Sequence, residues 1–172
     1  MTRSSLLLGL SLLSVSLAPQ AGSAELQWSD KNLPAPVQTI VNGYRQMCSD
    51  IDGKLAAGYD MPMIMTGDVD GDGIQDFVFN PENMQCSAAQ TTYCSNGGCQ
   101  ISLALSGNKY AEPIEIMGGA PFLSQSDGKA VLNVWVSNSE CETTETESSC
   151  LGRFSWKDGK LDTTHLARQF QD

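Results

Sequence analysis

Apolar residues recur at helical spacing in one segment near the start of the chain. Pro36 stands where a first helical residue is tolerated, and the apolar residues that follow it lie on one side of a helix. These residues are Val37, Ile40, Val41, Tyr44, Met47 and Cys48. The spacing predicts an amphipathic helix over about 36–48, which Gly43 weakens slightly.

After this segment the pattern changes to the period of two that is typical of β-strands. Met61, Met63 and Met65 alternate with Pro62 and Ile64, which predicts a strand that its proline places near a sheet edge. The aromatic and β-branched run at 77–79 predicts a second strand. A further strand is predicted at 101–105, where apolar residues alternate with polar or small ones.

Three two-residue turn sequences each join apolar residues that a tight hairpin would place on one face of a sheet. The turns and pairs are Gly107-Asn108 with Leu105 opposite Tyr110, Asp127-Gly128 with Leu123 opposite Leu132, and Asp158-Gly159 with Trp156 opposite Leu161. They favour an antiparallel meander of five to seven strands. The predicted fold class is therefore α+β and β-dominant, with one N-terminal amphipathic helix over the apolar side or one end of the sheet.

The first 24 residues have the pattern of a secretory signal peptide. Arg3 gives a basic start, an apolar run covers 6–17, and small residues at 21–24 suit cleavage. The apolar run is too short for a membrane helix, and polar residues follow at once, so no membrane span is expected after the signal is removed. We predict a signal peptide over 1–24 and a single β-rich domain over 25–172, in a periplasmic or secreted protein of bacterial type.

Six cysteines occur in the predicted exported part, and an even number in an oxidising compartment indicates three disulfides. Proximity in the sequence favours Cys94 with Cys99 and Cys141 with Cys150, which leaves Cys48 to join Cys86 and tie the helix to the sheet. A zinc site or a redox thiol is the alternative. The chain contains no Cys-x-x-Cys motif, and its single histidine is distant in sequence, which argues against zinc.

Acidic residues outnumber basic ones by 20 to 10, which gives a formal net charge of -10. Nucleic acid is therefore not an expected partner. A protein or a glycan stays open as a partner. The acids are densest at 68–76, where four aspartates alternate with glycines before the strand at 77–79. Counted from Asp68, the candidate metal ligands take positions 1, 3, 5, 7 and 9: Asp68, Asp70, Asp72, the carbonyl of Ile74, and Asp76. Only oxygen donors converge, so the spacing predicts a Ca²⁺ loop.

This segment, with Gly73 at position 6, resembles the DxDxDG calcium loops of FG-GAP/VCBS-type repeats and of dockerins. The resemblance covers about a dozen residues and implies the same five ligands. An EF-hand places a bidentate glutamate at position 12, where this chain has Phe79, so a further ligand would come from elsewhere, such as Glu82, or from water.

No catalytic motif accompanies the loop. The chain has no Gly-x-Ser-x-Gly elbow, phosphate loop or HExxH motif, and His165 has no evident nucleophile near it in sequence. The predicted function is that of an exported, calcium-binding, β-rich binding or structural protein. Two alternatives stay open: a secreted or periplasmic hydrolase with a carboxylate site, and Cu(I) binding by the methionines of 61–65.

A last acidic segment begins just before Cys141 and runs along the loop to Cys150. Its glutamates alternate with serine and threonine, which is typical of a solvated charged loop closed by a disulfide; a partner surface or a second weak cation site is the alternative. They are Glu140, Glu142, Glu145 and Glu147.

Overall fold

The computed structural model describes residues 28–141 and 148–169, so the predicted signal peptide at 1–24 lies outside the described residues. Helix α1 covers Ala35–Ser49 and confirms the helix predicted from the apolar spacing. The strands are β1 (Met63–Gly67), β2 (Asp76–Asn80), β3 (Cys94–Ser95), β4 (Gly98–Ala104), β5 (Ile114–Ser126), β6 (Lys129–Val136), β7 (Ser148–Lys157) and β8 (Lys160–Gln169). Short 3-10 turns are η1 (Pro81–Asn83), η2 (Ser106–Asn108) and η3 (Asn138–Cys141).

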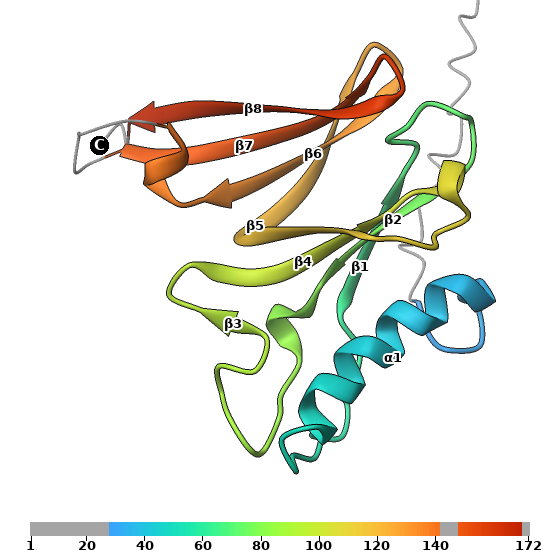
Figure 1. The fold of residues 1–172 in the computed structure, drawn as a ribbon, viewed down its shortest axis with the longest axis vertical. Helices are drawn as coiled ribbons and strands as arrows, with labels where there is room; N and C mark the ends of the chain where they lie inside the picture. Colours follow the sequence, from blue (N-terminus) through green and yellow to red (C-terminus); the bar gives the residue numbers. More distant parts are fainter. Residues whose placement is uncertain (1–27, 142–147, 170–172) are drawn as a thin grey trace, which may run out of the picture.

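Within the described residues the strands form one antiparallel sheet in the order β1-β2-β4-β5-β6-β7-β8, and β3 pairs with β4 beside this path (Figure 1). The β-dominant fold with an antiparallel sheet and one helix is confirmed. The predicted number of five to seven strands is wrong, because the sheet has eight. Strand β3 has only two residues, which is too few to show a period of two in the sequence.

The long strand β5 belongs to two parts of this sheet. Residues 114–118 pair with β4, while 119–126 pair with β6, and the register shifts between Gly119 and Phe122. We call β1–β4 and the first part of β5 the N-half, and the second part of β5 with β6–β8 the C-half. The two halves therefore share one strand.

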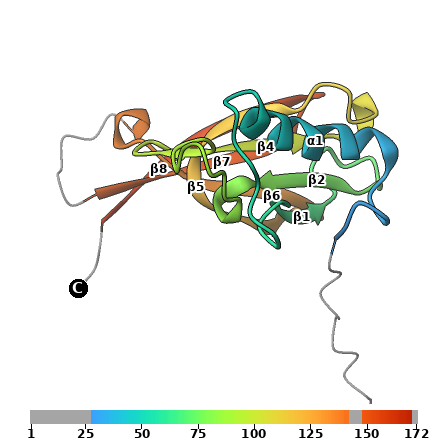
Figure 2. The ribbon, with the colours of Figure 1, turned by 90° about the horizontal axis from the view of Figure 1, so that it is seen from below.

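Two hydrophobic cores lie on opposite faces of the N-half. Phe77 and Phe79 of β2 face α1 and pack with its buried residues, among them Val37 and Val41. The intervening Val78 points to the other face and packs in a second core. Further members of that core come from both halves of the sheet: Ile101, Leu103, Leu132, Val134 and Phe154. The fold therefore has three layers, with α1 on one side of the N-half and the C-half on the other (Figure 1). Seen from below in Figure 2, α1 lies across the strands of the N-half.

Three disulfides join the cysteine pairs that proximity predicted. They are Cys48–Cys86, Cys94–Cys99 and Cys141–Cys150. The first joins the last turn of α1 to the segment after η1, so it fixes the helix to the N-half of the sheet. In the described part of the chain, no helix is long and apolar enough to cross a membrane.

Two of the three predicted hairpins are confirmed. Strands β5 and β6 meet at Asp127-Gly128 with Leu123 opposite Leu132. Strands β7 and β8 meet at Asp158-Gly159 with Trp156 opposite Leu161. Each turn has two residues with positive φ: 52° and 79° in the first, 50° and 78° in the second. These angles are those of type I′ turns, which match the twist of the strands.

The third hairpin is wrong. Ser106–Asn108 forms η2, and β5 begins only at Ile114. Leu105 lies in the core shared by the two halves, whereas Tyr110 packs against the core under α1, so these two residues do not share a face. A two-residue turn does not form because the N–H groups of Ser106 and Gly107 donate to the carboxylates of Asp76 and Asp70 instead.

Replacing Gly128 or Gly159 with valine should lower the free energy of unfolding by about 1 kcal/mol or more, since a β-branched residue strains at positive φ. Denaturant melts measure the loss. Gly97→Val is the matched control, because Gly97 also lies in a turn but does not have positive φ. An equal loss in the control would show that the turn conformation is not the cause.

Candidate metal site

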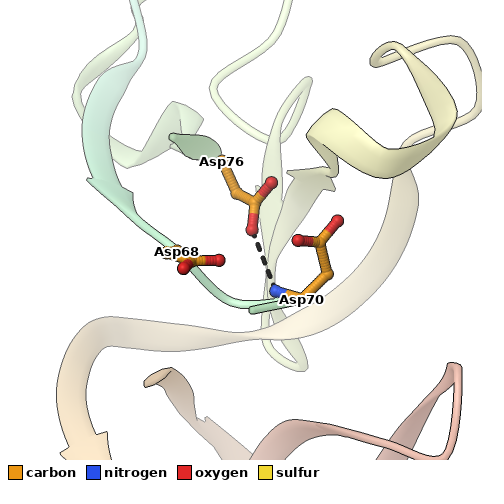
Figure 3. Close-up of side chains that lie close together, drawn as sticks. All are labelled: Asp68, Asp70 and Asp76. Atoms are coloured by element: carbon orange, nitrogen blue, oxygen red, sulfur yellow. Dashed lines mark hydrogen bonds between the residues drawn. The ribbon is translucent and has the colours of Figure 1, made fainter. Parts of the chain in front are cut away.

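The loop between β1 and β2 gathers three carboxylates. Asp68 and Asp70 lie on the loop and Asp76 is the first residue of β2, and one carboxylate oxygen from each lies within 4.8 Å of the others (Figure 3). The antiparallel pairing of β1 with β2 brings this about, because Gly67 is paired with Asp76 at the base of the loop. The structure therefore brings together three of the five ligands predicted from the sequence.

Asp76 is fully buried and organises the loop around it. One of its oxygens accepts hydrogen bonds from the N–H groups of Val69, at 2.6 Å, and Asp70, at 3.1 Å. The other accepts from the N–H of Ser106, at 2.7 Å, and from its hydroxyl, at 2.9 Å. A carboxylate has about four lone-pair positions, so these four donors occupy the acceptor capacity of Asp76.

The other two carboxylates close the loop with one hydrogen bond to each oxygen. Asp68 accepts from the N–H groups of Gly71, at 2.7 Å, and Gly73, at 3.0 Å. Asp70 accepts from the N–H groups of Asp72, at 3.2 Å, and Gly107, at 3.0 Å. Each of these four oxygens therefore keeps a lone pair that is free for a cation.

The remaining predicted ligands lie outside this three-carboxylate cluster. The Asp72 carboxylate accepts from the N–H of Ile74 at 2.7 Å, and it shares the single hydroxyl proton of Ser106, at 3.0 Å, with Asp76. Ile74 is 56% exposed. Glu82 accepts from the side chain of Asn80 and lies beyond the end of β2 that is farthest from Asp76, so it is not placed to supply a further ligand.

Turn η2 is a second part of the site that the sequence did not predict. Ser106 lies between Asp72 and Asp76 and donates to both, and Gly107 donates to Asp70. Gly107 must also be small, because a Cβ there would lie 2.8 Å from an Asp70 oxygen. These residues are more than 30 positions from the loop in sequence, and no local signal connects the two segments.

The C-half of the sheet also contacts the loop. The N–H of Ala130 donates to the carbonyl of Asp68 at 2.8 Å. The ammonium of Lys129 lies 3.5 Å from the carbonyl oxygen of Asp70. Among the described residues, no ion pair involves a loop carboxylate. The negative charges of the loop are therefore not neutralised by a side chain in contact with them.

Burial and like charge both act on the ionisable groups of the site. Burial raises the pKa of Asp70, and the charges of Asp76 and Asp72 add to this effect, while the N–H of Gly107 opposes it. The pKa of Tyr110 is also raised, first by burial and then by the same carboxylates. Both shifts indicate that negative charge is held at high density here.

A groove between α1 and β5 contains an acid outside the loop, so it tests the alternative of a hydrolase with a carboxylate site. Its volume is about 300 Å³, and Glu115 is the only acid among its described lining residues. The Ser102 hydroxyl donates to the Glu115 carboxylate at 2.9 Å and lies 2.6 Å from the Tyr44 hydroxyl. Burial raises the pKa of Glu115, against the effect of hydrogen bonds from Ser102 and Gln100. The groove thus lacks the paired acids that hydrolysis of a glycoside requires.

The other candidates from the sequence do not form clusters in the described residues. Met61 packs against the core under α1 and Met65 against the other core, while Met63 is 45% exposed, so the three thioethers do not share one face. His165 is an exposed residue of β8, paired with Gly152. Glu140 is exposed in η3; the remaining glutamates of that acidic segment, at 142, 145 and 147, lie outside the described residues.

Comparison with known proteins adds no family to this picture: no protein-family model, no curated protein and no solved structure matches the chain.

Proposed function

We propose that the loop between β1 and β2 binds Ca²⁺, and that the bound ion stabilises an exported β-rich protein whose function is to bind a partner. The observation that carries this proposal is the cluster of Asp68, Asp70 and Asp76. Two carboxylates about 5 Å apart repel by about 3 kcal/mol at an effective dielectric constant of about 20. A divalent cation removes this repulsion, and a donor set made only of oxygen favours Ca²⁺ or Mg²⁺ over softer metals.

The roles of the carboxylates follow from their hydrogen bonds. Asp76 contributes charge and fixes the loop, because four donors already occupy its oxygens. Asp68 and Asp70 supply the oxygens with free lone pairs. By resemblance to the loops of FG-GAP/VCBS-type repeats and dockerins, Asp72 and the carbonyl of Ile74 complete the set. A loop with this many oxygens suits the six to eight ligands of Ca²⁺ better than the octahedral, strongly hydrated Mg²⁺.

The proposed ion is structural and not catalytic. The loop joins β1 to β2 and is bonded to η2 and to β6, so an ion in it would hold three segments of the fold in place. Three disulfides are typical of proteins that fold in an oxidising compartment, which supports a periplasmic or secreted location.

Calcium should raise the melting temperature, and this is the test of the proposal. For a dissociation constant of roughly 10⁻⁴ to 10⁻³ M, tens of millimolar Ca²⁺ should stabilise the fold by about 1 to 4 kcal/mol by mass action, and Mg²⁺ by much less. The measurement is a thermal melt of chelator-treated protein with and without each ion. Asp68→Ala and Asp70→Ala should abolish the shift.

Glu112→Ala is the matched control, because it also removes an exposed carboxylate near the site without touching the loop. It should keep the full shift produced by Ca²⁺. Identical melts with calcium and with chelator would refute the proposal. A turnover that the chelator removes without changing the melt would assign the ion to catalysis and favour the hydrolase.

A further inference from the structure

The C-half has a face that is turned away from both cores. Leu132, Val134 and Phe154 point into the core between the halves, so the alternate positions on β6 and β7 point outward. We call this side the outer face. Helix α1 lies across the N-half on the far side of the molecule and does not cover it (Figure 1).

Basic residues are concentrated on the outer face although the chain as a whole is acidic. Five of the chain's 10 lysines and arginines lie on this side of the C-half: Lys129, Arg153, Lys157, Lys160 and Arg168. One acid of β8, Asp162, lies among them, opposite Ser155. Lys157 is directly opposite Lys160 across β7 and β8. None of the five forms an ion pair with a described acid. Like charges placed directly opposite each other, such as Lys157 and Lys160, destabilise a sheet slightly, so this arrangement needs a reason other than stability.

The outer face contains a cavity next to three of these basic residues. A cavity of about 450 Å³ is lined by Lys129, Arg153 and Lys157. Hydroxyl groups stand beside the charges in the same lining, from Ser126, Ser155 and Thr164. The only acid that lines it among the described residues is Asp127, in the β5–β6 turn. Such a hollow offers positive charge and hydrogen-bonding groups to an anionic ligand.

Exposed apolar side chains continue the outer face away from this hollow. Phe122 is 41% exposed and is opposite Asn133, two residues before Trp135. Trp135 is 36% exposed and is opposite Leu151. Leu151 itself is buried, and its other cross-strand neighbour, Leu166, is exposed. Trp135 also lines a second hollow of about 520 Å³. An aromatic strip of this kind on an open sheet face marks a binding surface more often than a packing defect.

We propose that the outer face binds an acidic polysaccharide, a polymer of sugar rings that carry carboxylates. The arginine and lysines would pair with the carboxylates, and the planar guanidinium of Arg153 suits a carboxylate best. Phe122 and Trp135 present ring surfaces to the C–H faces of the sugars. This inference goes beyond the calcium site, since none of the three loop carboxylates lies on this face.

A sugar polymer fits the charge of the whole molecule better than nucleic acid does. Duplex DNA carries a negative charge about every 1.7 Å, and a net charge of -10 repels such a polymer. The acidic loop also adjoins the hollow, because Lys129 reaches the carbonyl of Asp70. A polysaccharide with one carboxylate on alternate rings has fewer negative charges per unit length, so the acidic loop repels it less. Its apolar ring faces can also pack against the aromatic residues.

Calorimetric titration with a short oligosaccharide of alternating glucuronate and N-acetylglucosamine tests the proposal. Binding should weaken several-fold as NaCl rises from about 50 to about 200 mM, because counter-ions are released. Arg153→Gln and Trp135→Ala should each weaken it by about tenfold, as removal of a central arginine or tryptophan contact does. An N-acetylglucosamine oligomer of equal length, which is neutral, should bind at least about tenfold more weakly.

Two variants provide matched controls. Lys54→Gln removes an exposed lysine elsewhere, and Ile51→Ala removes an exposed apolar side chain just after α1, on the far side of the molecule. Both should change the affinity by less than about twofold. Thermal melts of all four variants separate a lost contact from a lost fold.

Equal binding of the neutral oligomer, tighter binding of a single-stranded oligonucleotide of the same length, or equal loss in the control variants would each overturn the proposal. The titration is run on both calcium-loaded and chelator-treated protein. Absence of binding alongside a calcium-dependent melt would reject the polysaccharide surface alone. Binding alongside a melt that calcium does not change would reject the calcium site alone.

Discussion

Replacing Asp76 with asparagine should lower the free energy of unfolding by about 1 to 3 kcal/mol even when a chelator is present, because an amide leaves at least one N–H donor around it without an acceptor. This loss should exceed the repulsion from Asp68 and Asp70 that the change relieves, since the N–H groups bonded to Asp76 already offset much of that repulsion. The carboxylate of Asp76 accepts four hydrogen bonds, two at each oxygen. In asparagine the nitrogen replaces one oxygen and itself donates. It faces either the Val69 and Asp70 N–H groups or Ser106, whose hydroxyl can rotate to accept from it but whose N–H cannot. Denaturant melts measure the loss.

The matched control for this change is Asp72→Asn, in the same loop. Asp72 is exposed and its carboxylate accepts only one backbone hydrogen bond and one from the Ser106 hydroxyl. The same loss of charge should therefore cost less than about 1 kcal/mol there. If the two variants lost equal stability, the effect would come from loop charge and not from the hydrogen bonds of Asp76.

Removing the Cys48–Cys86 disulfide should be the most destabilising change to the cross-links. Its cysteines are 38 residues apart, against 5 for Cys94–Cys99. In the chain-entropy account, replacing Cys48 and Cys86 by alanine lowers the free energy of unfolding by about 4 kcal/mol, and replacing Cys94 and Cys99 lowers it by about 2 kcal/mol.

Urea melts of the two double variants give the comparison directly. Burial adds to the difference in stability, since Cys48 is 1% exposed and holds the end of α1 against the core. A larger loss for the Cys94 and Cys99 variant would mean that the short β3–β4 ribbon, and not the attachment of the helix, limits stability.

Elements with a clear local pattern could be predicted from the sequence. Helix α1 follows from its apolar stripe, and the hairpins at Asp127-Gly128 and Asp158-Gly159 follow from residues that tolerate positive φ. The disulfide pairs follow from sequence proximity. In each case the information lies within a few residues of the element itself, or in the small number of cysteines.

Features set by distant contacts could not be predicted. Gly107-Asn108 has the composition of a hairpin turn. However, the N–H groups of Ser106 and Gly107 donate to the carboxylates of Asp76 and Asp70, and the segment forms turn η2 instead. The division of β5 between two halves depends on a register shift near Gly119, which has no periodic signal. For the site, the spacing located the loop and three clustered carboxylates, but it did not reveal Ser106 as their donor.

Among the described strands, β8 ends the sheet and is paired along one edge only, with β7. An open edge of ten residues is a template onto which a strand from another molecule can add, and this is a route to aggregation. Charged side chains recur along β8, at Lys160, Asp162 and Arg168, and the first two lie beside the tight turn. Charges at an edge disfavour such addition. Lys160 and Arg168, which contribute to the charge of the outer face, therefore also disfavour strand addition at this edge.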